Sequence, residues 1–122
     1  MNGFGRRRSK ARAATGCCEL CGKQGFPTPD GSYYLEAHHV IPMSCNGCDD
    51  ERNVVAICAD DHRRAHFGAD RHVVREQLIW DVLYKHYPDD ESFFEYLDEL
   101  SLAIERSDIL VRKIEEQHVA GD

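Results

Sequence analysis

The stretch that decides the fold is residues 33–68, which read YYLEAHHVIPMSCNGCDDERNVVAICADDHRRAHFG. Residues 33–41 are aromatic and β-branched with rough alternation and end at a proline, which predicts a strand. Residues 42–52 are rich in Ser, Asn, Gly and Asp, a composition typical of a loop. Residues 53–58 predict a second short strand, and residues 59–66 predict a helix with two aspartates in its first turn. The predicted order is therefore strand, loop, strand, helix.

Four histidines in this stretch predict a metal site. His38 and His39 are adjacent in the first predicted strand, and His62 and His66 are i,i+4 neighbours on one face of the predicted helix. Successive side chains of a strand point to opposite faces, so His38 and His39 cannot both hold the same ion. We therefore expect one of the two to bind a metal ion together with the helical pair, and the other to be free to act as a base.

The spacing of the cysteines predicts a structural zinc site. The six cysteines are Cys17, Cys18, Cys21, Cys45, Cys48 and Cys58. The CxxC spacing of 18–21 and 45–48 lets two thiolates reach one tetrahedral ion from a tight turn. Cys58 begins a further limb, but Asp61 stands where a second cysteine would complete it. The expected ligands are Cys18, Cys21 and Cys58, with Asp61, Cys48, Cys45 or a water as the fourth.

Two other uses of the cysteines are disfavoured. A disulfide framework is typical of secreted chains, and the basic residues near the start are not followed by the apolar segment of a secretory signal. A redox-active CxxC pair belongs to a βαβ unit, and no such pattern surrounds residues 18–21.

Length and charge bound the class of protein. The 122 residues fit one domain, and no apolar run approaches the roughly 20 residues of a membrane span, so we expect a soluble cytoplasmic protein without a membrane partner. The net charge of −7 is uneven, with +5 in residues 1–16, −4 in residues 17–88 and −8 in residues 89–122. The acidity is concentrated near the end of the chain, so it does not exclude a nucleic-acid partner.

Apolar residues recur at helical spacing beyond residue 69. Val74, Leu78 and Val82 are i,i+4 neighbours, and further apolar faces lie in residues 93–104 and 109–114. These patterns predict amphipathic C-terminal helices that enlarge a small core or form a homodimer or partner surface.

Residues 18–68 closely resemble the HNH endonuclease family and its ββα-metal fold. The histidine, asparagine and histidine that name the family fall on His39, Asn53 and His62, followed by the additional His66. The resemblance implies an α+β fold class, a small ββα-metal finger with a cysteine-rich zinc staple, followed by the C-terminal helices. Family members with a zinc staple pair two CxxC limbs, and this chain departs from them at Asp61.

The resemblance also implies an activity, the metal-dependent hydrolysis of phosphodiester bonds of DNA. His39 would activate water, and Asn53 would hold either the His39 ring or the intervening loop. A divalent ion, Mg, Mn, Ni or Zn, would be held by His38 and His62, with His66 as a further candidate ligand. Glu36, on the strand face of His38, would support a metal-bound imidazole.

Three further expectations concern contacts to DNA, the division of the chain and an alternative function. Arg63, Arg64 and Arg71 are candidate contacts to the DNA backbone. Residues 1–16 form a basic flexible arm, residues 17–68 the nuclease core and residues 69–122 a helical extension packed on it. The alternative function is a catalytically inactive, zinc-stapled module that binds nucleic acid or protein.

Overall fold

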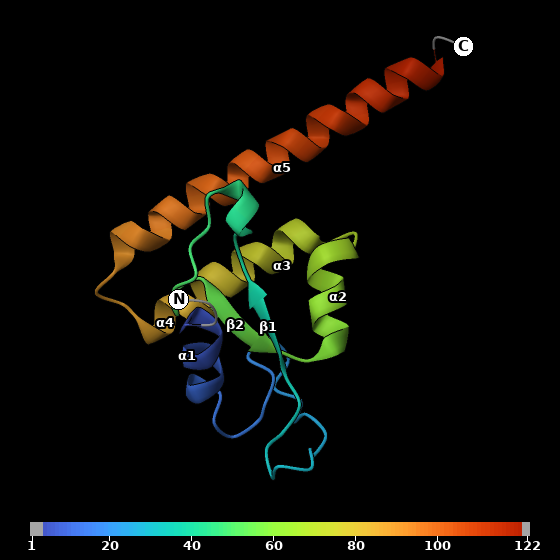
Figure 1. Cartoon of the computed structure of the whole chain (residues 1–122). Coiled ribbons are helices and arrows are strands. Elements are labelled where there is room, and N and C mark those ends of the chain that lie inside the picture. Colours follow the sequence, from blue (N-terminus) through green and yellow to red (C-terminus); the bar gives the residue numbers. More distant parts are fainter. Residues whose placement is uncertain (1–3, 121–122) are drawn as a thin grey trace.

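The computed structural model describes residues 4–120, with side chains described for residues 5–115. Strand β1 (Glu36–His39) pairs with β2 (Val54–Ile57) in a two-stranded antiparallel sheet, and α2 (Ala59–Phe67) follows directly (Figure 1). A short 3-10 turn, η1 (Met43–Cys45), lies in the loop between the strands. The predicted α+β class and the order strand, loop, strand, helix are confirmed.

The sheet positions the two strand histidines through its register. His38 pairs with Val55 and His39 with Val54, and every residue of β2 is buried. Helix α2 begins immediately after β2 because Cys58 acts as its N-cap, with its sulfur accepting from the Asp61 N–H. The sheet and α2 thereby face each other across a short connection, which brings the two pairs of histidines together.

The N-terminal segment differs from the predicted flexible arm. Residues Phe4–Arg12 form α1, which packs against β2. Small residues permit this contact, since Gly5 and Ser9 are buried and a Cβ at Gly5 would lie 2.8 Å from Val54 Cγ2. The run of basic residues predicted a solvated arm. The packing against the sheet was missed because the small residues that make it give no hydrophobic periodicity.

Arg12 fastens α1 to the rest of the molecule. Its guanidinium pairs with Glu19 through two N–O contacts of 2.7 and 2.8 Å, and the side chains of Arg12 and Glu19 are 10% and 7% exposed. It also donates to the backbone oxygens of Glu51 and Val54. Arg12, one of the five basic residues of 1–16, is therefore largely buried and has a structural role.

Among the described residues, the C-terminal segment supplies six of the fourteen buried hydrophobic residues of the core. Helix α3 (Arg71–Gln77) continues through a π-helical turn, η2 (Leu78–Leu83), into the short α4 (Tyr84–His86). The fully buried side chains of α3 and η2 pack with those of α5 (Glu91–Ala120). Those of α3 and η2 are Val74, Leu78, Ile79 and Leu83, and those of α5 are Phe94 and Leu97.

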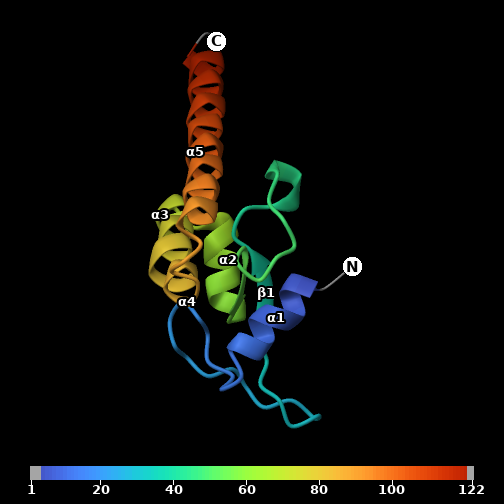
Figure 2. The same ribbon diagram turned by 90° about the vertical axis from the view of Figure 1, so that its left-hand side faces the viewer.

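Helix α5 runs without a break through both apolar faces predicted beyond residue 93. Its first half lies on the body of the protein and its second half projects away from it (Figures 1 and 2). Leu110, Val111 and Ile114 are more than half exposed on the projecting part. Within residues 4–120, no helix combines the length and apolarity needed to cross a membrane.

Candidate metal centre and catalytic residues

Three histidines from two elements converge on one point. The ligand nitrogens of His38 on β1 and of His62 and His66 on α2 all lie within 4.8 Å of one another. The ring centroids are 4.9 to 5.1 Å apart. The i,i+4 spacing on α2 places its two rings side by side, and the β1–β2 pairing turns His38 toward them.

The hydrogen bonds of Glu36 fix which nitrogen of His62 carries its hydrogen. Glu36 accepts from the Tyr34 hydroxyl at 2.6 Å and lies 2.7 Å from His62 Nδ1, and these two contacts lower the pKa of the Glu36 carboxyl. An ionised carboxylate only accepts, so His62 Nδ1 must donate. The Nε2 atom of a neutral His62 then has a free lone pair, and it lies 3.2 Å from His66 Nε2.

Burial keeps the other two rings in the neutral form that binds metal. The pKa of His38 is lowered to about 3, first by burial and then by the neighbouring His62 and His66. Burial also lowers the pKa of His66, with a further contribution from His62. Three imidazoles that face one another are a donor set that fits a divalent transition metal.

His39 has a different partner from His38. Its Nε2 lies 3.0 Å from Asp49 Oδ1, and the two side chains are 20% and 23% exposed. Asp49 also lies close to α1. A Cβ atom added at Gly5 would be 2.6 Å from the same carboxylate oxygen, so only a glycine leaves room for it there. Asp49 was not predicted as a site residue, since a loop aspartate next to another aspartate gives no spacing signal.

Asn53 is buried and closes the loop between the strands. Its side chain accepts from the Ile41 N–H at 2.9 Å and donates to the Ile41 and Cys48 carbonyl oxygens at 2.9 and 2.8 Å. These contacts correspond to the second of the two predicted roles, the one in which Asn53 holds the loop. Cys48 precedes Asp49, so Asn53 also fixes the backbone beside the partner of His39.

Three cysteines and one aspartate form a second cluster. The ligand atoms of Cys18, Cys21, Cys58 and Asp61 all lie within 4.8 Å of one another. Cys18 Sγ is 3.1 Å from Asp61 Oδ2, and Cys21 Sγ is 4.0 Å from Cys58 Sγ. Asp61 is buried, and it is the predicted fourth ligand that the structure places with the three thiols.

The electrostatics of this cluster fit a zinc ion. Burial raises the pKa of Asp61, but hydrogen bonds from the three thiols lower it overall, so this side chain is a carboxylate. The pKa of Cys21 is raised to about 12, first by its hydrogen bond to Asp61 and then by burial. A zinc ion fits this set of donors, because it deprotonates coordinating thiols, offsets the resulting negative charge and is held tetrahedrally by S and O donors.

Two of the three candidate DNA-binding arginines have acidic partners. Arg64 pairs with Asp70, with its Nε 3.1 Å from Asp70 Oδ2, and Arg71 Nη2 lies 3.4 Å from Asp108 Oδ2. Arg63 is exposed on α2. The structure also places Arg75, which the sequence-based account left out, beside His38, whose pKa it helps to lower.

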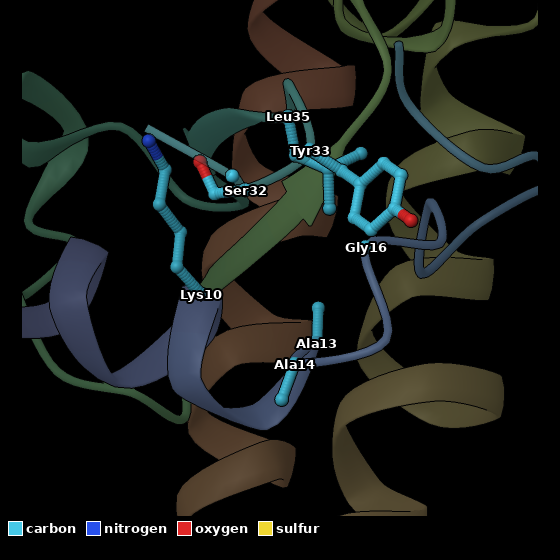
Figure 3. Close-up of a pocket in the computed structure, with 8 residues that line it drawn as sticks. Lys10, Ala13, Ala14, Gly16, Ser32, Tyr33 and Leu35 are labelled. Atoms are coloured by element: carbon cyan, nitrogen blue, oxygen red, sulfur yellow. The ribbon is translucent and has the colours of Figure 1, made fainter. Parts of the chain in front are cut away.

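A separate cavity of about 350 Å³ lies between α1 and the segment that precedes β1. Lys10 extends from α1 toward this segment, near Ser32, and the Tyr33 ring lies over Gly16 (Figure 3). None of the residues that line it belongs to the histidine or cysteine cluster. Both candidate metal clusters therefore lie outside this cavity.

Comparison with known sequences identifies the segment that carries both clusters. Residues 18–68 match the HNH endonuclease family. The predicted resemblance is confirmed over the same residues, and all seven members of the two clusters fall within the HNH segment.

Two relatives of the HNH segment have names that describe nucleases. A type IV methyl-directed restriction enzyme of Escherichia coli strain K12 is 45% identical over 68 residues, which are 55% of this chain and 24% of that enzyme. A probable mobile endonuclease of Enterobacteria phage T4 is 43% identical over 35 residues, which are 29% of this chain and 13% of the relative. The chain thus spans a quarter or less of the length of these relatives, and the similarity supports nuclease function for the segment they share.

Proposed function

We propose that this chain is a metal-dependent endonuclease that hydrolyses phosphodiester bonds of DNA. One observation carries the proposal. Within the HNH segment, His62 Nε2 lies 3.2 Å from His66 Nε2, beside His38. Two ring nitrogens that face each other at this distance repel unless a hydrogen or a cation lies between them, and the third ring makes a cation the better fit.

The divalent ion would be held by His38, His62 and His66, with Glu36 orienting His62. When bound, such an ion offsets negative charge on the phosphate and on the leaving oxygen. Imidazole ligands favour Zn or Ni, and Mg and Mn are the other ions to be tested.

His39 is the proposed general base. Its Nε2 lies 3.0 Å from Asp49 Oδ1, and with Nε2 as the donor of this hydrogen bond, Nδ1 is the atom that would accept a proton from water. Asn53 holds the loop at Cys48, which keeps Asp49 in place and therefore the His39 ring in one orientation. Asn53 and Asp49 are thus proposed to be positioning residues that orient the His39 ring.

The second cluster is proposed to be a structural zinc site with Cys18, Cys21, Cys58 and Asp61 as ligands. Cys58 also caps α2, the helix that carries His62 and His66. A zinc ion bound there fixes the start of that helix against the segment around Cys18, and so stabilises the geometry of the histidine cluster.

DNA is the proposed substrate for two reasons. The relatives are named as a restriction enzyme and a mobile endonuclease. Exposed basic side chains, among them Arg6, Lys10 and Arg63, offer contacts to a phosphate backbone. Association through α5, with a second copy or another protein, stays a prediction that rests on its exposed apolar residues.

Cleavage of supercoiled plasmid by the full chain tests the proposed function. We expect nicked or linear DNA with at least one of Mg, Mn, Ni or Zn, and no product after a chelator is added. Absence of product with every ion, from protein that is folded and contains zinc, would contradict the proposal and favour the inactive binding module.

A further inference from the structure

A small cavity opens directly beside the histidine cluster. It has a volume of about 150 Å³ and is lined by His38 and His66 on one side and by Arg71, Arg75 and Asp108 on the other. Helix α3, which carries both arginines, contacts α2 as well as α5, which carries Asp108 (Figure 2). At about 30 Å³ per water, the cavity holds roughly five waters, so it suits one phosphate group but not a base pair.

The two arginines differ in how they are held. Arg75 is half-buried, and its guanidinium donates to the hydroxyl and carbonyl oxygens of Ser101 on α5. Burial lowers the pKa of Arg75, and the acidic neighbours Asp108 and Glu76 offset this only in part. A cation in such surroundings is stabilised when a further anion approaches it.

Asp108 now occupies the position that such an anion would take. Its Oδ2 lies 3.4 Å from Arg71 Nη2 and 3.2 Å from His72 Nε2. The side chains of Arg71 and Asp108 are 36% and 40% exposed. Pairs this exposed contribute little to stability, so a nucleic-acid phosphate can replace the carboxylate at small cost.

We propose that this cavity is a subsite for one phosphate of the DNA strand, next to the phosphate that is cut, and that Asp108 covers it in the free protein. The proposal rests on the proposed nuclease function for the identity of the strand. Arg71 supplies a planar fork that fits phosphate oxygens, and Arg75 supplies fixed positive charge behind it. The same α5 helix that completes the core therefore places a competing carboxylate at the edge of the site.

DNA binding by full chain carrying His39→Ala tests this subsite without cleavage. Anisotropy of a short fluorescein-labelled duplex is measured over a salt series. We expect Arg71→Gln to weaken binding by about 5- to 10-fold and to reduce the slope of log K against log salt by about 1. Arg106→Gln removes the same charge from an exposed position of α5 and is the matched control, with an expected change below about twofold.

The Asp108 part of the proposal has its own variants. Asp108→Asn should tighten binding by up to about fivefold, whereas Glu99→Gln, on an exposed part of the same helix, should change it less. In Arg71→Gln background most of the Asp108→Asn gain should disappear, because Asp108 acts through Arg71. Thermal unfolding of each variant shows that the fold is retained.

The outcomes separate the subsite from the nuclease activity. If wild-type chain cleaves plasmid while Arg71→Gln and Arg106→Gln bind DNA alike, the subsite is wrong and the proposed function stands. If wild-type chain cleaves nothing but Arg71→Gln still weakens binding and lowers the salt slope, the phosphate subsite stands without the nuclease. Equal binding of Asp108→Asn and Glu99→Gln would overturn the covering role of Asp108.

Discussion

Asp49 Oδ1 lies 3.0 Å from Nε2 of His39, so the loop between the strands reaches back onto the last residue of β1. Removing this acceptor frees the His39 ring to rotate. We expect Asp49→Ala to lower kcat for DNA cleavage by about 10- to 100-fold with little change in KM, by analogy with other residues that orient a functional histidine.

The conservative variant distinguishes orientation from general damage. Asp49→Asn retains an oxygen that can accept the Nε2 hydrogen, so it should keep more activity than Asp49→Ala. Asp89→Ala, at an exposed position before α5, is the control. Wild-type kcat in Asp49→Ala, or a loss that lies only in KM, would be inconsistent with a positioning role.

Glu36 should determine how tightly the histidine cluster binds its ion. Glu36→Ala removes the carboxylate that holds His62 Nδ1 at 2.7 Å, so the ring loses its fixed orientation. We expect the affinity for the divalent ion to fall by about 10- to 100-fold in titration calorimetry of zinc-stapled protein. Glu95→Ala, exposed on α5, should bind like wild type, and equal affinity in the two variants would refute the role of Glu36.

Zinc content should depend on Asp61 and not on Cys48. Asp61→Ala removes one of four converging ligands, so we expect loss of about one zinc per chain and a lower Tm. Asp61→Cys should retain zinc, since it completes the second CxxC limb, and Cys48→Ser should retain it as well. Elemental analysis of purified chains checks this, and loss of zinc from Cys48→Ser alone would rule out the proposed ligand set.

The order of strands and helix could be predicted from the sequence because its signals are local. Alternation marks β1, and the i,i+4 spacing of His62 and His66 places them on one face of α2. The choice of Asp61 over Cys48 depends on which loop lies near Cys18, and spacing alone left it open. Arg75 was missed for the same reason, since it lies beside His38, which is far away in the chain, whereas Asp49 was missed because a loop aspartate gives no spacing signal.

The buried ion pair of Arg12 could not be predicted from the sequence either. A run of basic residues predicts a solvated arm, yet Arg12 is buried against Glu19. Arg12→Ala leaves the Glu19 carboxylate buried without its cation, and we expect the free energy of unfolding to fall by about 3 kcal/mol. Urea unfolding measures the change; Arg6→Ala, at an exposed position, should cost below about 0.5 kcal/mol. Equal stability of the two variants would contradict a structural role for Arg12.

A pair of acidic side chains between α3 and α5 predicts a dependence of stability on pH. Burial, followed by the neighbouring Asp98, raises the pKa of Glu76 to about 7 from an ordinary value of 4.5. The folded chain then keeps a proton that the unfolded chain has lost. Stability from this group is full below about pH 4.5 and falls as the pH rises to about 7.

The variant Glu76→Gln isolates this contribution. It mimics the protonated carboxyl, so its Tm relative to wild type should rise between about pH 5 and about pH 8. A Tm difference that stays constant over this range would show that Glu76 does not titrate between these values in the folded chain.

The most direct test of the proposed function is plasmid cleavage by His39→Ala beside wild type, each with its metal content measured. If His39 is the base and His38, His62 and His66 hold the ion, the variant should be folded, should retain both metals and should show no cleavage with an ion that activates wild type. Undiminished cleavage by His39→Ala under these conditions would contradict the mechanism.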